Sequence, residues 1–105
     1  VMKRIAFKMH LKEGQKEAYV KRHNELWGEL KSLLKESGVH EYSIFLDEET
    51  NTLFGFQKVN GDEGSQDLGQ IDIVKKWWDF MSDSMEVNED NSPVKVELNE
   101  VFYMK

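Results

Sequence analysis

The chain has 105 residues, of which 39% are hydrophobic and 11% aromatic, enough to build one domain around an apolar core. Its formal net charge is −6 at pH 7 and its basic residues are scattered, which argues against a nucleic-acid partner. The sequence has no long uncharged apolar run and no signal-peptide layout, so we expect no membrane segment. The lack of cysteine excludes disulfides, thiolate metal ligands and a cysteine nucleophile. We therefore expect a single cytoplasmic domain over residues 1–105.

Apolar residues repeat along the chain with two different periods. Alternation of apolar and polar residues predicts strands, and apolar spacings of three and four predict helices. The resulting order, β-α-β-β-α-β, is typical of an α+β ferredoxin-like sandwich, in which two helices pack on one face of an antiparallel sheet. The predicted elements are strand 3–11, helix 13–36, strand 39–47, turn 48–51, strand 52–59, loop 60–69, helix 71–85, loop 86–93 and strand 94–104.

The later strands carry apolar residues on both of their faces. Ile44 is followed by Phe45, and Leu53 by Phe54, so each pair places one apolar side chain on either side of the sheet. A lone antiparallel sheet usually leaves one face polar. Since the predicted elements include nothing to cover a second apolar face, we predict a homodimer.

The second predicted helix has more apolar surface than packing on a sheet requires. One stripe contains Trp78, and another, about 100° away around the helix, contains Trp77. The second stripe can face a cavity, where aromatic rings stack on the C–H face of a sugar. Ordinary core or interface packing of both tryptophans is the alternative.

One helical segment combines a histidine with aromatic residues. Tyr19, His23 and Trp27 are four residues apart, which places them on one face of the predicted helix. Histidine can exchange a proton near neutral pH, but a histidine on an apolar face is often a hydrogen-bonded core residue. Tyr19 and Tyr42 can likewise orient a hydroxylated ligand or close the core. No two histidines have helical metal-ligand spacing, so we expect no metal site.

Four short motifs occur in a characteristic order. They are Arg-His-Asn at 22–24, Trp-Trp at 77–78, Asp-Asn-Ser-Pro at 90–93 and Leu-Asn-Glu-Val-Phe-Tyr at 98–103. With these motifs the sequence resembles the L-rhamnose mutarotase family from Met2 to its end. The resemblance implies a dimeric α/β barrel that interconverts the α and β anomers of L-rhamnose, without a metal or organic cofactor.

The resemblance also implies roles for particular residues. His23 would be the catalytic proton donor, while Trp27 would belong to the core. The residues implied to line the sugar site are Tyr19, Tyr42, Trp77 and Trp78. Two other functions remain open: a different small enzyme on the same barrel, such as a monooxygenase or another aldose mutarotase, and a non-catalytic dimeric sugar-binding module.

The chain departs from the family pattern in three places. The family often has prolines where this chain has Glu25 and Gly28, and Glu89 replaces another proline. The segment 60–69 is richer in glycine than the family pattern. We expect these changes to alter local geometry and to leave the candidate site residues in place.

Overall fold

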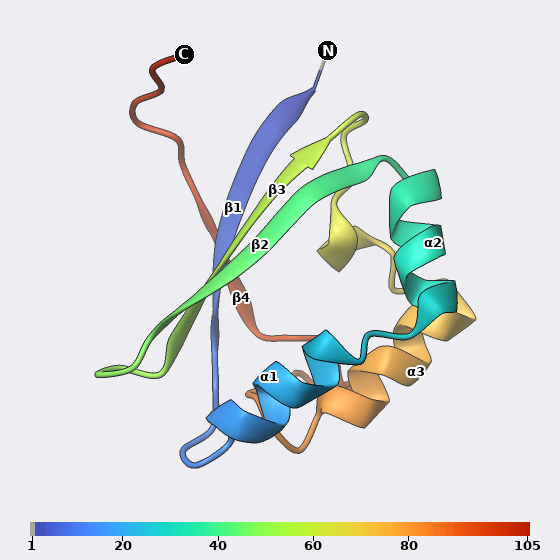
Figure 1. Ribbon diagram of the computed structural model, residues 1–105, viewed down its shortest axis with the longest axis vertical. Coiled ribbons are helices and arrows are strands. Elements are labelled where there is room, and N and C mark those ends of the chain that lie inside the picture. Colours follow the sequence, from blue (N-terminus) through green and yellow to red (C-terminus); the bar gives the residue numbers. More distant parts are fainter. Residues whose placement is uncertain (1) are drawn as a thin grey trace.

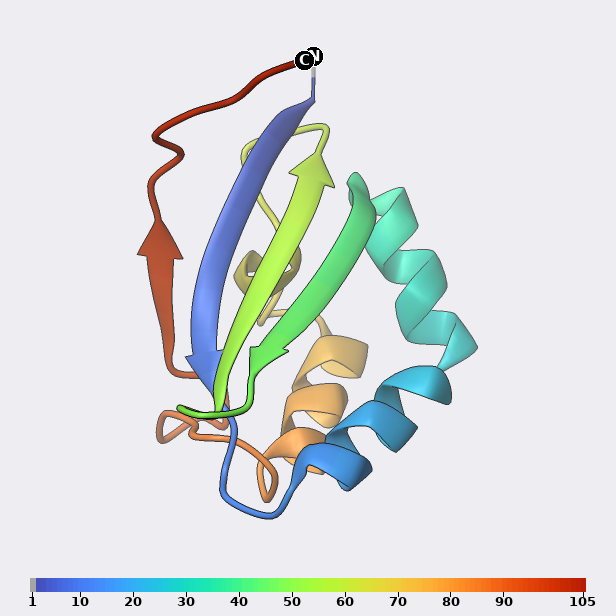
Figure 2. The ribbon, with the colours of Figure 1, turned by 60° about the vertical axis from the view of Figure 1, so that its left-hand side comes forward.

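A computed structural model describes residues 2–105 (Figure 1). The strands form one antiparallel sheet in the order β2-β3-β1-β4, and the helices lie on one face of it (Figures 1 and 2). This is the ferredoxin-like arrangement that the element order predicts. None of the helices in residues 2–105 has the length and apolarity needed to span a membrane. The elements are β1 (Lys3–His10), α1 (Lys16–Asn24), α2 (Gly28–Glu36), β2 (Val39–Asp47), β3 (Thr52–Val59), the 3-10 helix η1 (Ser65–Asp67), α3 (Asp72–Met81) and β4 (Lys95–Leu98).

The prediction of one continuous helix over 13–36 was wrong. The structure has α1 and α2 instead, and Trp27 between them has an extended backbone, with φ −57° and ψ 128°. A straight helix of that length would run for roughly 36 Å. Two short helices can turn around the helical side of the sheet, as Figure 2 shows, and Gly28 makes continuation through this point unfavourable. Trp27 therefore does not share a helix face with Tyr19 and His23.

The last two predicted elements are shorter than expected. The helix predicted for 71–85 ends at Met81, and the strand predicted for 94–104 extends only from Lys95 to Leu98. Beyond β4, side-chain contacts and not backbone pairing connect the chain to β1. The Arg4 guanidinium donates two hydrogen bonds of 2.9 Å to Glu100. The same guanidinium lies 3.4 Å from the ring centroid of Tyr103. The tail is thus held beside the start of β1 without extending the sheet.

The inner face of the sheet, which the helices cover, forms the core. Phe7 and Met9 of β1 and Leu53 and Val59 of β3 are almost fully buried there. A β-carbon at Gly55 would lie 2.6 Å from the Phe7 ring, so this ring lies directly against the backbone of β3. Close packing of the inner face therefore depends on a glycine in the middle of the sheet.

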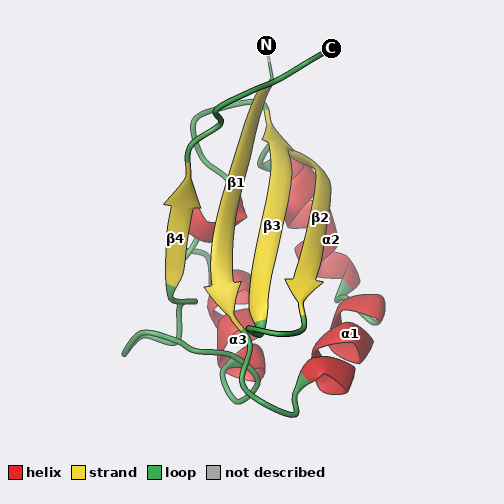
Figure 3. Cartoon of the chain, turned by 90° about the vertical axis from the view of Figure 1, so that its left-hand side faces the viewer, coloured by secondary structure: helices red, strands yellow, loops and turns green. Residues whose placement is uncertain are grey.

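The outer face, by contrast, exposes a band of apolar side chains. Strand pairing places Phe45 beside Phe54, while Phe54 lies opposite Lys8 of β1. Phe45 is 67% exposed and Phe54 is 38% exposed. Of the helices described in residues 2–105, none covers this face, which is turned toward the viewer in Figure 3. We call the following residues the outer apolar band: Ala6, Phe45, Phe54, Phe56, Val96 and Leu98.

Candidate functional site

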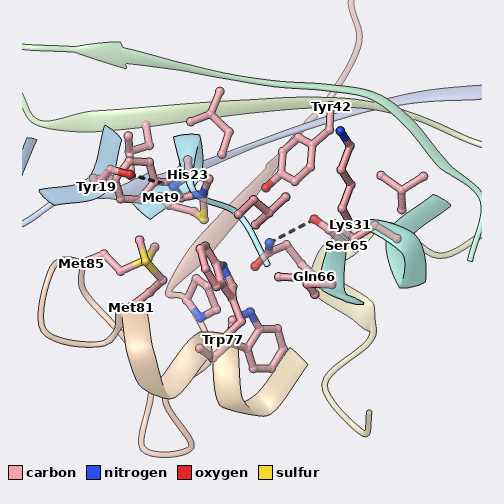
Figure 4. Close-up of a pocket in the computed structure, with 18 of the residues that line it drawn as sticks. Met9, Tyr19, His23, Lys31, Tyr42, Ser65, Gln66, Trp77, Met81 and Met85 are labelled. Carbon is pink, nitrogen blue, oxygen red and sulfur yellow. Dashed lines mark hydrogen bonds between the residues drawn. The ribbon is translucent and has the colours of Figure 1, made fainter. Parts of the chain in front are cut away.

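A cavity of about 620 Å³ lies between the inner face of the sheet and the helices (Figure 4). This volume is within the range of roughly 300–1,000 Å³ that is typical of small-molecule sites. Its walls come from β1, β2, β3, all three α-helices and η1. The structure brings all of the sequence-predicted site residues to this one cavity: Tyr19, His23, Tyr42, Trp77 and Trp78.

His23 lies on α1 with one ring nitrogen already engaged. Its Nδ1 is 2.9 Å from the backbone carbonyl oxygen of Tyr19, one helical turn earlier. A carbonyl oxygen can only accept, so Nδ1 carries the proton and Nε2 of the neutral ring has a free lone pair. Burial lowers the pKa of His23, and the hydrogen bond to the Tyr19 carbonyl acts in the opposite direction. The neutral imidazole is therefore the resting form near pH 7.

Aromatic rings hold His23 on two sides. The Tyr19 ring centroid is 4.3 Å from that of His23, and the Trp77 centroid is 5.4 Å away with its ring perpendicular to the imidazole. Trp77 is itself supported by Trp27, at 5.1 Å, and by Phe80, at 5.7 Å. Trp27 packs against the core and does not line the cavity. The second aromatic stripe of α3 is therefore both a cavity wall and a support for the histidine.

Trp78 is fixed by a close backbone approach. A β-carbon at Gly69 would lie 2.7 Å from the Trp78 ring. The ring is thus held between the turn before α3 and the cavity. In the glycine-rich segment 60–69, Gly69 thus leaves room for the Trp78 ring against the backbone.

A β-bulge lies just before Tyr42, which lines the cavity. The pairing of β2 with β3 shifts between His40 and Ser43, and Glu41 in the bulge has a positive φ of 47°. Because strand residues alternate between faces, the extra residue allows Val39 and Tyr42, three positions apart, both to face inward. Regular alternation from Val39 would have turned Glu41 inward, so the bulge is what lets Val39 share the inner face with Tyr42.

The two cavity tyrosines remain uncharged. Burial raises the pKa of Tyr19 far above its ordinary value, with the nearby Tyr42 adding to the effect. Burial also raises the pKa of Tyr42, against the opposing influence of Ser65, Gln57 and Gln66. Both hydroxyls can donate and accept hydrogen bonds, and neither is available as a tyrosinate base near neutral pH.

Sequence reasoning missed a polar cluster opposite Tyr42, formed by Gln57, Ser65 and Gln66. Gln57 is fully buried on β3, accepts a 3.0 Å hydrogen bond from the backbone N–H of Ser65, and donates to the Ser65 hydroxyl. Gln66 Nε2 donates to the same hydroxyl over 3.2 Å. A signal was present, because Gln57 interrupts the apolar inward positions of the strand between Leu53 and Val59.

Arg22 and Asn91, from the motifs at 22–24 and 90–93, hold the elements around the cavity together. Arg22 donates hydrogen bonds to Asp83, at 2.7 Å, and to the Phe80 carbonyl, at 3.1 Å, which ties α1 to the end of α3. The Arg22 guanidinium also holds the pKa of Asp83 below its ordinary value. Asn91 donates to Asp79 over 2.9 Å, while Pro93 reaches the cavity wall.

The cavity has few candidates for a cofactor role. Among residues 2–105, no three His, Asp or Glu side chains gather in a way that could hold a metal ion. Glu41, the acidic residue of the cavity rim, is paired with Lys58 at 3.0 Å. Two histidines, His23 and His40, line the cavity, and His23 is the one that packs against Tyr19 and Trp77.

Fold and site together define a small ferredoxin-like α+β protein with an aromatic-walled pocket around one histidine. The model of the L-rhamnose mutarotase family matches residues 4–104. An L-rhamnose mutarotase of Formosa agariphila is 68% identical over 104 residues, covering 99% of this chain and 100% of that one. One from Bacteroides thetaiotaomicron is 61% identical over 103 residues, covering 98% and 99% of the two chains. This chain belongs to the L-rhamnose mutarotase family.

Solved structures agree with this assignment. The crystal structure of an L-rhamnose mutarotase from Formosa agariphila superposes with a TM-score of 0.91 at 65% identity, covering 98% of this chain and 99% of that one. A Methanosarcina mazei protein of 19% identity superposes with a TM-score of 0.61, over 95% and 93% of the two chains. The second likeness concerns the fold alone.

Proposed function

We propose that this protein is an L-rhamnose mutarotase, an isomerase of the aldose 1-epimerase type that exchanges the α and β anomers of the sugar inside the cavity. The observation that carries the proposal is the geometry of His23. Its Nδ1 is committed to the Tyr19 carbonyl, so Nε2 is left to exchange protons in an aromatic-walled cavity. The family of the chain and the names of its relatives support the choice of sugar.

One imidazole nitrogen can serve the whole reaction. Neutral His23 takes the proton from the anomeric hydroxyl while the bond between C1 and the ring oxygen breaks, and the imidazolium gives that proton to the ring oxygen. After the aldehyde rotates about the C1–C2 bond, the same steps in reverse close the ring on its other face. The protein gains and loses no net proton. Such acid–base assistance typically contributes about 10²–10⁴-fold.

The resting protonation state sets the order of these steps. The resemblance describes His23 as a proton donor, whereas burial favours a neutral imidazole at the start. His23 therefore acts first as the base and then as the donor within one ring opening. This order also provides the general base that the sequence alone left unassigned.

The other predicted site residues would hold the sugar. A tryptophan ring of α3 can stack on the apolar C–H face of the pyranose. The uncharged hydroxyls of Tyr19 and Tyr42 can exchange hydrogen bonds with sugar hydroxyls. We assign substrate-binding roles to Tyr19, Tyr42, Trp77 and Trp78.

A second copy of the chain is the proposed partner for the outer apolar band. Exposed apolar patches of this extent usually mark an interaction surface. Two copies related by a two-fold axis would place their bands face to face, which gives the dimeric α/β barrel expected from the sequence. The exposed phenylalanines at 45 and 54 support this arrangement.

The cytoplasm and L-rhamnose metabolism are the proposed setting. The sugar in the names of the relatives supports the metabolism, and the lack of cysteine is typical of cytoplasmic proteins. Cell fractionation with an antibody against the chain would test the location.

Saturation-transfer NMR on the anomeric protons of L-rhamnose tests the proposed activity. We expect the protein to accelerate anomer exchange, and His23→Ala to lower that acceleration by about 10²–10⁴-fold because the proton carrier is lost. His10→Ala, on the outer face of β1, is the matched control and should leave the rate unchanged.

Three outcomes would contradict parts of this proposal. If the wild-type protein adds nothing to the spontaneous exchange rate, the mutarotase activity is wrong. If it accelerates many aldoses equally, the reaction stands and the assignment to L-rhamnose falls. Sugar binding without exchange would indicate the non-catalytic binding module.

A further inference from the structure

The two ends of the cavity differ in chemistry. One end has the thioether side chains of Met9, Met81 and Met85 close to Tyr19 and His23 (Figure 4). The three methionines are 2–4% exposed. The opposite end in Figure 4 has the polar side chains of Tyr42, Ser65 and Gln66.

The strand register also shows, without reference to Figure 4, that the two ends of the cavity are far apart. Met9 lies opposite Leu53, whereas Gln57, the anchor of the polar end, lies opposite Ile5. These two rows are four residues apart along the sheet, which is roughly 13 Å. A bound monosaccharide can therefore contact the methionine end and the polar end at once.

The polar end contains an acceptor that the protein leaves unpaired. Gln66 Oε1 is buried and has no hydrogen-bond partner among residues 2–105. Its Nε2 donates a hydrogen bond to the Ser65 hydroxyl, which also accepts one from Gln57. A buried polar atom without a hydrogen-bond partner is uncommon and unfavourable. A ligand that donates a hydrogen bond to this oxygen would remove that free-energy cost.

The surrounding backbone holds this acceptor in place. A β-carbon at Gly64 would lie 2.7 Å from Gln57 Oε1 and 2.5 Å from Ile5, so the segment approaches β3 as closely as only glycine allows. The carboxylate of Asp67 accepts a 2.9 Å hydrogen bond from the Gly64 N–H. The turn that presents Gln66 is therefore fixed before any ligand arrives.

The chemistry of the proposed reaction orients the sugar in the cavity. His23 must reach the ring oxygen and the anomeric oxygen. In L-rhamnopyranose the methyl group is on C5, next to the ring oxygen, and C3 is directly across the ring. A sugar with its ring oxygen at His23 thus directs its methyl group toward the methionines and its C3 hydroxyl toward the polar end.

We propose that Gln66 determines specificity in this site by accepting a hydrogen bond from the C3 hydroxyl of the sugar. This inference rests on the proposed mutarotase function. Pocket acceptors of this kind reject analogues that lack the hydroxyl, because the buried acceptor is then left unpaired.

Anomer exchange of L-rhamnose and of its 3-deoxy analogue tests the role of Gln66. Both sugars retain the reacting oxygens, so both can mutarotate. We expect wild-type kcat/KM to be about 10–100-fold lower for the 3-deoxy analogue. Gln66→Met, of similar length and without the acceptor, should lose a similar factor on L-rhamnose and should no longer distinguish the two sugars.

Two further variants separate recognition from structural damage. Gln66→Glu keeps an acceptor oxygen and should still favour L-rhamnose over the analogue. Gln70→Met makes the same side-chain change at an exposed position of the neighbouring turn and should behave as wild type.

The outcomes distinguish this inference from the function on which it rests. If the wild-type protein fails to accelerate L-rhamnose exchange, the proposed function falls. If it accelerates exchange of both sugars equally, or loses more on a 4-deoxy analogue, the role of Gln66 is wrong while the mutarotase function stands. Should Gln66→Met fail to fold, the wild-type comparison and Gln66→Glu still decide the question.

Discussion

The two faces of the central sheet use similar apolar residues for opposite purposes. On the inner face, Phe7 lies against Gly55, and the helices close over a cavity that also contains hydroxyl, amide and imidazole groups. On the outer face, Phe45 and Phe54 lie side by side and remain exposed. The inner face thus combines tight packing with a cavity, whereas no helix described in residues 2–105 covers the outer face.

This difference shows how one short strand can serve two functions. Phe54 and Gly55 are adjacent in β3, and strand alternation turns them to opposite faces. The residue on one side is suited to association between chains, and the residue on the other is required for the fold within a chain. Substitutions at these neighbouring positions should therefore have separable effects.

The largest effect is expected on the outer face. Phe54→Glu would place a charge in the centre of the proposed dimer interface, twice for each two-fold pair. Each buried aromatic anchor contributes about 2 kcal/mol or more to association. With two copies of Phe54 in the interface, the free energy of dimerisation would weaken by on the order of 4 kcal/mol, which raises the dissociation constant about a thousand-fold. Light scattering coupled to size-exclusion chromatography would measure the change from dimer to monomer.

A matched variant controls for added charge. Ser32→Glu introduces the same carboxylate on the exposed side of α2 and should leave assembly unchanged. A wild-type chain that is monomeric at every concentration would refute the dimer. An unfolded Phe54→Glu chain, judged by circular dichroism, would indicate that the outer face also supports the fold of a single chain.

A smaller effect is expected one residue further along, on the inner face. Gly55→Ala forces the Phe7 ring away from a β-carbon that would lie 2.6 Å from it. Overpacking of this kind costs about 1–3 kcal/mol, which thermal unfolding at fixed protein concentration would detect. Gly61→Ala is the control, because a β-carbon there meets no atom within 4 Å. Equal unfolding temperatures for both variants would show that Phe7 moves aside freely.

The smallest effect concerns the protonation of His23. Burial lowers the pKa of His23 in the folded chain, so the imidazole stays neutral at pH values below its ordinary pKa of about 6.5. The unfolded chain takes up the proton first as pH falls. The contribution of His23 to stability is therefore present above about pH 6.5 and is lost as pH falls through the lower folded pKa.

The same titration gives a test of the order of proton transfer. If neutral His23 acts first as a base, kcat/KM for anomer exchange should be constant near neutral pH and should fall in acid as the imidazolium forms. NMR exchange rates over about pH 5–8, corrected for the spontaneous reaction, would show this. A rate that rises as pH falls would instead indicate that the protonated ring starts the reaction.

Much of the fold could be predicted because it depends on local periodicity. The positions of the strands along the chain, both helical regions and the hairpin between 39 and 59 follow from the spacing of apolar residues. The break at Glu25–Trp27 could not be found in this way, since it depends on how two helices turn around a sheet. The proline pattern of the family at these positions was the one available indication.

The candidate site was partly visible for the same reason. Tyr19 and His23 lie one turn apart on a single helix, and the paired tryptophans of α3 are adjacent, so local geometry relates the members of each pair. The cluster around Gln66 was missed, because segment 60–69 meets β3 only in the folded chain, through the close contact at Gly64 and the hydrogen bonds between Ser65 and Gln57.

The amino-acid sequence was enough to predict the α+β class, the surplus of apolar surface and the residue types from which a site could be made. These features depend on composition and on contacts between near neighbours along the chain. The folded chain adds three features: which apolar surface is buried, the β2 bulge that lets Val39 and Tyr42 share the inner face, and the unpaired acceptor of Gln66. Such features arise where segments distant in the sequence share one space, and the physical demands of close packing and hydrogen bonding apply to that space as a whole.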